Sequence, residues 1–491
     1  MTGLVGSTLS DRLRDLRARC SGIAPLTARL EPWQIEECSD ADGLADALAL
    51  HGSPLNILDV APFARNVSDL RAVADAHAIA FRLFFARKAN KAITFVNEAL
   101  RLGLGVDVAG ERELRQVLDR GAIPRDVVVT AAVKPHSLLR LCVDSGVTMV
   151  LDNLDELDVL DTVLETTGSR ASVAIRLAPE FADDRTPTRF GMAPSDALAV
   201  AANVSLDVVG VHFHLDGYSA SDRVDALGQA VSLVDLLREH GHAPSFVDIG
   251  GGIPMSYLES SRQWREFWKQ HRAGLLGAAP PLTFDAHGLG LVEHAGTLLG
   301  RPAVYPYHQL PVRGAWLEQI LASPLCLPGR APSHSVASGL RERGLELRCE
   351  PGRSLLDGCG LTAARVEFRK QRRDGTWLIG LAMNRTQCRS TSDDFMLDPL
   401  LLRPSTSTVM ARYPTGPIEG YLVGAYCIER ELLTWRRLRF PEGVDVGDIV
   451  VFPNTAGYMM HILESASHQI PLARNVVRQA TGGHLLDPID S

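Results

Sequence analysis

Short apolar runs alternate with helix-length segments through the middle of the chain. Eight runs have the length and composition of buried strands: 82–87, 104–109, 127–132, 148–152, 172–177, 208–215, 245–251 and 345–350. Alternating strands and helices are typical of parallel βαβ units, and eight strands in series predict a closed (β/α)8 barrel of the TIM type. A doubly wound open sheet is the alternative, but no G-x-G-x-x-G follows the first strand.

The regions on either side of these strands have a different pattern. Residues 356–491 form short β-like runs separated by turn residues, which predicts a C-terminal all-β domain. We expect residues 53–355 to form the barrel and residues 1–52 to be an N-terminal extension that partly joins the β-domain. The long interval at about 253–344 is predicted to be an insertion that acts as a lid or a specificity element.

Composition narrows the class of protein. Of 491 residues, 46% are apolar and 22% are charged, which excludes a disordered chain, a collagen and a coiled-coil rod. The net charge is −8 and no domain is basic, so we expect no nucleic-acid partner. The eight cysteines form no C-x-x-C pair, and no apolar run is long enough for a signal peptide or a membrane span. We therefore expect a reduced, cytoplasmic enzyme without a membrane partner.

Polar residues end several of the predicted strands. Lys88 follows the first strand, Asp107 lies in the second, and His212 and His214 share one face of the sixth. In a barrel of this type the active site lies at the carboxyl ends of the strands, so we expect these side chains to meet at one rim. An H-x-H pair can bind a metal, but no matching histidines end the other strands, and we expect no metal.

The last two barrel strands end in further candidate groups. Three consecutive glycines, Gly250, Gly251 and Gly252, leave three backbone N–H groups free to approach an anion such as phosphate. Arg353 could add a charged contact to the same anion. A tight turn is the simpler interpretation of the glycines, and a salt bridge with Arg353 is the simpler interpretation of Glu350.

Lys88 and Glu350 together suggest pyridoxal chemistry. A lysine that ends a buried apolar strand loses its charge when it forms an imine, as in enzymes that use pyridoxal 5′-phosphate. A lysine that extends to the rim is the alternative. A carboxylate at Glu350 could keep a pyridine nitrogen protonated.

A series of motifs along the chain resembles the fold-type III PLP-dependent decarboxylases, the group of the diaminopimelate, ornithine and arginine decarboxylases. The motifs stand in the family's order: HGSPLNILD, FFARKAN, GVDVAGERELRQVLDRG, GVHFHLDGYS, VDIGGGIP, CEPGRSLL, GAYCIERELL and NTAGYMM. Together they extend over roughly residues 53–460. The glycine run is a weak signal alone, whereas the ordered series is specific.

This resemblance implies a role for individual residues. Lys88 would form the Schiff base with pyridoxal phosphate, and His214 would stack on the cofactor ring. The implied cofactor-binding residues are Lys88, Asp107, His214, Gly250, Gly251, Gly252, Glu350, Arg353 and Tyr458. Lys88, Cys427 and His214 would be the catalytic residues, with Cys427 returning the proton from the partner subunit of a homodimer with shared active sites. A small buried hydrophobe is the alternative role for Cys427.

The activity that the resemblance implies is PLP-dependent decarboxylation of an amino acid. Racemases of the related, alanine racemase-like fold place an arginine opposite the pyridine nitrogen, so Glu350 favours decarboxylation. Two alternatives stay open: a racemase, elimination or carbon–carbon bond enzyme, and a silent homologue that binds a partner protein. Ile428 stands where the family commonly has an acidic residue for the substrate's distal amine, and Asp216-Gly217 stands where Gly-Ser is usual. These departures weigh against lysine, ornithine and diaminopimelate and predict a specialised member of amino-acid metabolism.

Overall fold

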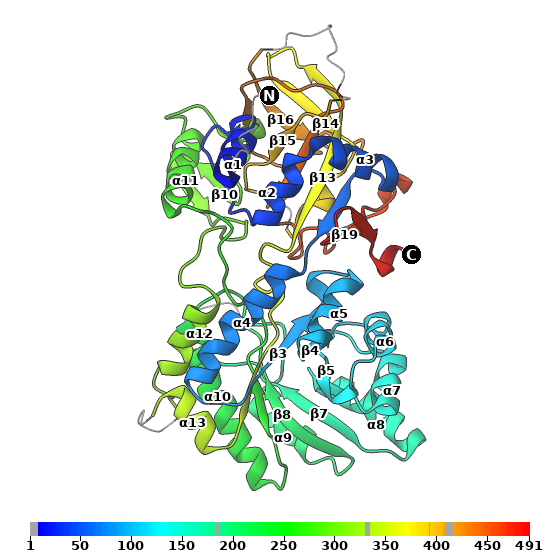
Figure 1. Cartoon of the computed structure of the whole chain (residues 1–491). Coiled ribbons are helices and arrows are strands. Elements are labelled where there is room, and N and C mark those ends of the chain that lie inside the picture. The colour runs from blue at the N-terminus through cyan, green and yellow to red at the C-terminus, as the bar shows by residue number, and fades with distance from the viewer. Residues whose placement is uncertain (1–7, 182–186, 329–333, 392, 406, 408–415) are drawn as a thin grey trace.

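The computed structural model describes residues 8–181, 187–328, 334–391, 393–405, 407 and 416–491. A barrel forms one lobe of the molecule and a β-sheet lobe lies above it, with the N-terminal helices packed on the sheet (Figure 1). Both lobes have their own hydrophobic core. Among the described residues, no helix combines the length and hydropathy that crossing a membrane requires.

Parallel strands close the barrel in the order β12, β3, β4, β5, β6, β7, β8, β9. Their bounds are β3 (Phe81–Ala86), β4 (Gly105–Val108), β5 (Val127–Val129), β6 (Thr148–Leu151), β7 (Ala171–Arg176), β8 (Leu206–His212), β9 (Phe246–Asp248) and β12 (Glu346–Cys349). Each of the eight runs expected from the sequence contributes one of these strands, so the predicted closed barrel is confirmed.

Helices surround the barrel and bury its outer face. They are α4 (Ala61–Ala76), α5 (Ile93–Arg101), α6 (Glu111–Asp119), α7 (His136–Ser145), α8 (Leu154–Thr167), α9 (Pro194–Ala201), α10 (Ala220–Glu239), α12 (Arg313–Ala322) and α13 (Val336–Glu342). Phe85 on the outer face of β3 packs against Phe63 of α4 and Phe95 of α5, with ring centroids 5.5 and 6.3 Å away. Such contacts fix the strand that ends in Lys88.

The barrel interior is packed rather than open. A small cluster of side chains fills it: Phe84, Val128, Val150, Ala174 and Phe246. The guanidinium of Arg348 lies 3.5 Å from the ring centroid of Phe246 and covers this cluster. The barrel therefore has no open channel, and Lys88, Asp107 and Glu350 lie at or near the carboxyl ends of its strands.

The second lobe is an antiparallel-rich sheet in the order β1, β17, β16, β14, β13, β2, β19, β20, and β18 joins β13 to β15. The bounds are β1 (Ser21–Gly22), β2 (Leu55–Leu58), β13 (Gly360–Gln371), β14 (Trp377–Leu381), β15 (Leu400–Leu402), β16 (Ile418–Val423), β17 (Leu438–Phe440), β18 (Ile449–Pro453), β19 (Arg474–Arg478) and β20 (His484–Leu486). The C-terminal β-rich region expected from the sequence is thus present.

The N-terminal part of the chain packs on this sheet. It contains α1 (Leu9–Ala18), α2 (Pro32–Ser39) and α3 (Ala41–His51), and β1 pairs with β17. Strand β2 pairs with β13 and β19 although it follows residue 53, where the barrel was expected to begin. The chain therefore crosses the sheet once more before it enters the barrel.

The long interval before β12 serves both lobes. Helix α11 (Ser261–Leu275) and the hairpin of β10 (Leu291–His294) and β11 (Thr297–Gly300) precede α12 and α13. Tyr257, Phe267 and Tyr307 of its first part belong to the core of the sheet lobe, whereas α12 packs against α4 and α10 of the barrel. Residues 329–333 of this interval lie outside the described residues.

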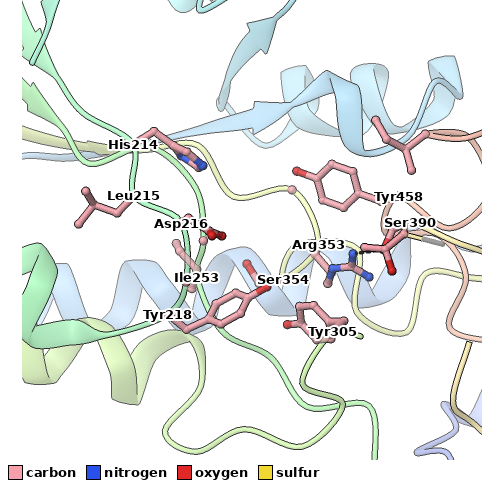
Figure 2. Close-up of a pocket in the computed structure, with 15 residues that line it drawn as sticks. His214, Leu215, Asp216, Tyr218, Ile253, Tyr305, Arg353, Ser354, Ser390 and Tyr458 are labelled. Carbon is pink, nitrogen blue, oxygen red and sulfur yellow. Dashed lines mark hydrogen bonds between the residues drawn. The ribbon is translucent and has the colours of Figure 1, made fainter. Parts of the chain in front are cut away.

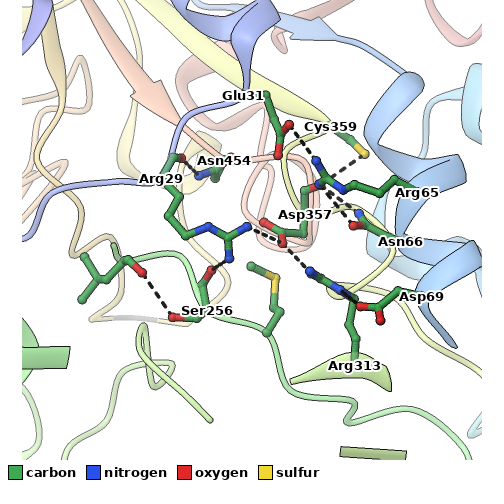
Figure 3. Close-up of polar contacts among 12 residues, drawn as sticks. Arg29, Glu31, Arg65, Asn66, Asp69, Ser256, Arg313, Asp357, Cys359 and Asn454 are labelled. Atoms are coloured by element: carbon green, nitrogen blue, oxygen red, sulfur yellow. Dashed lines mark hydrogen bonds and ion pairs between the residues drawn. The ribbon is translucent and has the colours of Figure 1, made fainter. Parts of the chain in front are cut away.

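A network of charged side chains joins the two lobes (Figure 3). Arg313 at the start of α12 donates to Asp357 over 2.6 Å and to Asp69 of α4 over 2.9 Å. Arg29 from the N-terminal part lies 3.8 Å from the same Asp357 carboxylate. Asp357 is buried and follows the Glu350–Arg353 turn closely, so the network anchors the segment that leaves that turn.

Candidate active site

A cavity of about 270 Å³ lies at the carboxyl ends of the barrel strands. Both lobes line it, and Figure 2 shows these side chains converging on one space. The lining residues are His214, Leu215, Asp216, Gly217, Tyr218, Gly252, Ile253, Tyr305, Gly352, Arg353, Ser354, Ser390, Thr391, Tyr458 and Ile462. Loops after β8, β9 and β12 supply the barrel side, as expected for this fold.

Lys88 follows β3 in a short 3-10 turn, η1 (Arg87–Ala89), beside this cavity. Its Nζ lies 2.6 Å from Oδ2 of Asp107 on β4, and Thr130 donates a hydrogen bond to the other oxygen of Asp107. Burial lowers the pKa of Lys88, but Asp107 and Glu350 act against it and hold that pKa well above its usual value. Burial, followed by the charge of Glu350, raises the pKa of Asp107. The lysine is thus charged and its carboxylate partner is desolvated.

Glu350 follows β12, and its buried carboxylate has an oxygen that accepts no hydrogen bond. Its Oε1 has no hydrogen-bond partner, although it lies 3.3 Å from Nε2 of His212. Burial raises the pKa of Glu350 and lowers that of His212. A desolvated acceptor of this kind calls for a cationic donor.

Asp248 completes a group with these two residues. Single ligand atoms of His212, Asp248 and Glu350 lie within 4.8 Å of one another, the one set of potential metal ligands in the described part of the chain. Burial and the charge of Glu350 raise the pKa of Asp248 well above its usual value. The raised pKa values make the two carboxylates poor ligands for a metal in the absence of further donors.

The glycine run differs from the sequence-based expectation of three free N–H groups. The N–H of Gly250 donates to Asp248 over 2.8 Å, and the N–H of Gly251 donates to Nδ1 of His214 over 3.1 Å. Of the three, Gly252 alone has an N–H without an acceptor among the described residues. A Cβ on Gly250 would lie 2.7 Å from Nδ1 of His214, so the run is needed for this close approach.

Arg353 lies on the cavity wall within a cage of tyrosines. It donates to the hydroxyl of Tyr257 over 3.1 Å and to Ser390 over 2.7 Å, and its guanidinium is 4.2 Å from the ring centroid of Tyr305. Tyr458 lies on another side, 5.2 Å from the guanidinium to its ring centroid. These partners replace the salt bridge with Glu350 that the sequence left as an alternative.

The structure does not bring Cys427 into this cavity. Cys427 is exposed, and its neighbour Ile428 is 46% exposed. The preceding Tyr426 is held by a hydrogen bond from its hydroxyl to the carbonyl of Ser465. Nine of the ten site residues expected from the sequence therefore lie in or around the barrel rim, and the tenth lies on the surface.

Sequence reasoning missed several residues of this site. Thr130 directly follows β5, and its position at the end of a predicted strand was the available signal. Tyr257 and Tyr305 come from the long interval, and Ser390 from the loop after β14, where no motif marks them. These residues reach the site through the packing of the two lobes against each other. Local sequence patterns do not indicate that packing.

Known proteins are similar to the chain over different shares of its length. A family profile described as the pyridoxal-binding domain of pyridoxal-dependent decarboxylases matches residues 63–279. The uncharacterized protein y4yA of Sinorhizobium fredii is 30% identical over 455 residues, 91% of this chain and 92% of that protein. Diaminopimelate decarboxylase of Pseudomonas aeruginosa is 31% identical over 248 residues, 47% of this chain and 60% of the enzyme. The alignment with that decarboxylase thus covers less than two thirds of its length.

Solved structures show the same fold. Diaminopimelate decarboxylase from Helicobacter pylori, complexed with L-lysine, superposes with a TM-score of 0.65 at 15% identity, covering 90% of this chain and 95% of that one. Lysine/ornithine decarboxylase from Vibrio vulnificus, complexed with cadaverine, gives 0.63 at 17% identity, covering 90% and 96%. Both contain the combination of lobes seen here.

Proposed function

Since this chain belongs to the family of pyridoxal-dependent decarboxylases and has pyridoxal phosphate as its cofactor, we propose that it decarboxylates an amino acid, with Lys88 as the lysine that binds the cofactor aldehyde. The observation that carries this proposal is the unpartnered Glu350 carboxylate at the same rim as the Lys88–Asp107 pair. The substrate and the individual residue roles are part of the proposal.

The residues at the rim fit the cofactor. Oε1 of Glu350 is a buried acceptor without a donor, which suits the protonated nitrogen of a pyridine ring. A Cβ on Gly352 would lie 2.6 Å from the hydroxyl of Tyr458 and 2.8 Å from Cβ of Ala89, so the turn is kept narrow beside Lys88. Gly252, Arg353 and Tyr458 line the cavity and supply donors for a phosphate.

When bound, the cofactor supplies an electron sink for the bond to the departing carboxylate. Lys88 must lose a proton before its Nζ reacts with an aldehyde, and the carboxylate of Asp107 is 2.6 Å away with a raised pKa. Asp107 is therefore the group that takes this proton. Glu350 provides the negative charge that retains a proton on the ring nitrogen, and Thr130 keeps Asp107 directed toward Lys88.

Cys427 is proposed as the acid that returns a proton to the substrate carbon. Its thiol is exposed and outside the cavity of its own chain, so it can act only in a second copy. The proposal therefore includes a homodimer in which each active site takes Cys427 from the partner subunit. An amino acid that reaches this site would also face Ile428, which offers no charge to a distal ammonium group.

Two other functions are compatible with the same site. A racemase, elimination or carbon–carbon bond enzyme would keep Lys88 and the cofactor but release no CO2. A silent homologue would retain the fold as a binding protein. Glu350 favours decarboxylation over racemisation because a carboxylate keeps the ring nitrogen protonated.

The first experiment is spectroscopic. Purified protein reconstituted with pyridoxal phosphate should absorb in the visible range, and Lys88→Ala should abolish this band while Lys91→Ala retains it. Lys91 is the matched control because it lies three residues further on and pairs with Glu464 instead. CO2 release is then measured across an amino-acid panel. A coloured protein that releases no CO2 from any amino acid would contradict decarboxylation, and a colourless wild type would contradict Lys88 as the cofactor lysine.

A further inference from the structure

Arg223 is a fully buried arginine behind the loops that line the cavity. It is the fourth residue of α10, and its side chain has no exposed surface. The two hydrogens of its Nη2 are shared among three backbone carbonyl oxygens: Gly217 O at 2.8 Å, Leu215 O at 3.1 Å and Gly251 O at 3.5 Å. One guanidinium therefore holds both the loop after β8 and the glycine loop after β9.

These contacts also fix the direction of the N–H group in each peptide whose carbonyl Arg223 binds. In a trans peptide the N–H of the next residue points opposite to the carbonyl. The three carbonyls bound by Arg223 therefore direct the N–H groups of Asp216, Tyr218 and Gly252 away from the guanidinium. All three residues line the cavity, and the described chain offers no acceptor to any of these N–H groups. Converging backbone N–H groups of this kind form an anion site.

The two loops touch each other at glycines. Gly217 and Gly252 have φ values of 88° and 77°, the left-handed region that favours glycine. A Cβ on Gly252 would lie 2.4 Å from Nη2 of Arg223 and 3.0 Å from the carbonyl oxygen of Gly217. Trp316 supports the same loop, because its Nε1 donates to the carbonyl of Tyr218 over 2.8 Å. The arrangement is thus fixed from behind and leaves no room for a side chain.

These backbone N–H groups lie beside an acidic side chain. Gly217 has no side-chain donor, and the carboxylate of Asp216 faces the cavity, where it would repel an anion (Figure 2). Burial lowers the pKa of Arg223 to about 10, which leaves the guanidinium charged at neutral pH. Its positive charge lies directly behind the three N–H groups and offsets Asp216.

We propose that Arg223 is a positioning residue for the cofactor phosphate: it directs three backbone N–H groups into the cavity and places a positive charge behind them. The guanidinium acts through the peptide groups and does not touch the phosphate. This inference rests on the proposed function, since it assumes that the cofactor phosphate occupies this cavity.

The test compares two aldehydes on the apoprotein. Pyridoxal phosphate and pyridoxal react with the same lysine and differ in the phosphate alone. Arg223→Met should weaken pyridoxal phosphate binding by about tenfold to a hundredfold, the loss expected for charge-assisted hydrogen bonds, and leave pyridoxal binding unchanged within about threefold. Arg223→Lys keeps the charge but cannot reach all three carbonyls, so its loss should be intermediate. Equilibrium titration by visible absorbance gives the dissociation constant of each aldehyde for the wild type and for each variant, and thermal unfolding of each apoprotein reports the fold.

Arg238→Met is the matched control. Arg238 lies in the last turn of the same helix and also donates to backbone carbonyls, those of Pro244 and Arg343, away from the cavity. The Arg238→Met variant should retain the wild-type preference for the phosphorylated aldehyde. An equal loss for both aldehydes in the Arg223 variants would overturn the inference, as would an unchanged preference, or failure of both Arg223 variants to fold while Arg238→Met folds. A wild type that forms no coloured adduct would instead overturn the proposed function.

Discussion

Lys88 and Asp107 lie on neighbouring strands of the barrel, with Nζ of the lysine 2.6 Å from Oδ2 of the aspartate. The pair places a charged amine next to a carboxylate that can accept its proton. Burial and the charge of Glu350 raise the pKa of Asp107, whereas Lys88 lowers it. Because Asp107 in turn raises the pKa of Lys88, each residue influences the protonation of the other.

Asp107→Asn removes the negative charge that raises the pKa of Lys88. The lysine should then lose its proton at lower pH, so the pH profile for trapping pyridoxal phosphate on Lys88 should move to lower pH. Borohydride reduction at a series of pH values followed by intact mass measures this profile. Asp126→Asn is the control, since Asp126 pairs with Arg82. A profile that stays in place would show that Asp107 does not set the protonation of Lys88.

Glu350→Gln should stabilise the apoprotein while it removes activity. The folded pKa of Glu350 is raised above its usual value of 4.5, so the folded state favours the neutral acid and loses stability as pH rises through the folded pKa. The variant should therefore match the wild type at acidic pH and exceed it near neutrality, as measured by urea unfolding of both apoproteins. We also expect activity to fall by about 10²–10³-fold, the scale for loss of a key electrostatic group. A wild type that is the more stable at neutral pH would contradict the prediction.

Gly352→Ala should disturb the turn beside Lys88. The added Cβ would lie 2.6 Å from the hydroxyl of Tyr458 and 2.8 Å from Ala89. Overpacking of this kind costs about 1–3 kcal/mol, and retention of the cofactor should fall with it. Gly110→Ala has open space around the new Cβ and is the matched control for both unfolding and cofactor retention. Equal stability and equal cofactor retention of the two variants would mean that Tyr458 and Ala89 can move to accommodate the new Cβ without measurable cost.

Cys427→Ser should keep the visible absorbance of the bound cofactor and lose amine formation. Mixing it with Lys88→Ala should restore about a quarter of wild-type activity, because half of the dimers are mixed and each mixed dimer holds one intact site. Activity of the refolded mixture and of each parent tests this. Cys326→Ser, at another exposed cysteine, should behave like the wild type. No recovery in a mixture proven to contain mixed dimers would exclude a shared site.

Asp357→Ala should destabilise the junction of the two lobes. The variant leaves the buried Arg313 guanidinium with Asp69 alone, and loss of a hydrogen bond between charged groups costs about 1.5–3 kcal/mol. Asp374→Ala breaks an exposed pair with Arg372 at the tip of the β13–β14 hairpin and should leave the midpoint of urea unfolding unchanged. Equal midpoints for the two variants would mean that the junction network contributes little.

The barrel was predictable because its strands are buried on both faces and appear as apolar runs at regular intervals. The residues at the strand ends could be predicted for the same reason, since parallel strands bring Lys88, Asp107 and Glu350 to one rim. The pairing of β2 was missed because Leu55–Leu58 finds its partners some 300 and 420 residues later, as the registers Leu58–Gly360 and Leu55–Arg474 show.

The hydrogen bonds and buried contacts within the site could not be predicted from the sequence. Three glycines in sequence do not reveal that two of their N–H groups are bound by Asp248 and His214. Likewise, the sequence indicates only that Arg223 is a polar residue of a helix. Its burial results from the packing of α10 against two loops. Tyr305 acquires its place beside Arg353 through the meeting of the lobes.

The pairing of β2 with β13 also constrains how the chain acquires its structure during translation. All eight barrel strands lie between these two partners, and the closing strand β12 leaves the ribosome before β13 does. The barrel can close while β2 still has no neighbour, and β2 then gains β13 and finally β19. The sheet lobe is therefore the last part to assemble, and a nascent chain arrested before residue 360 would display an apolar, unpaired Leu55–Leu58.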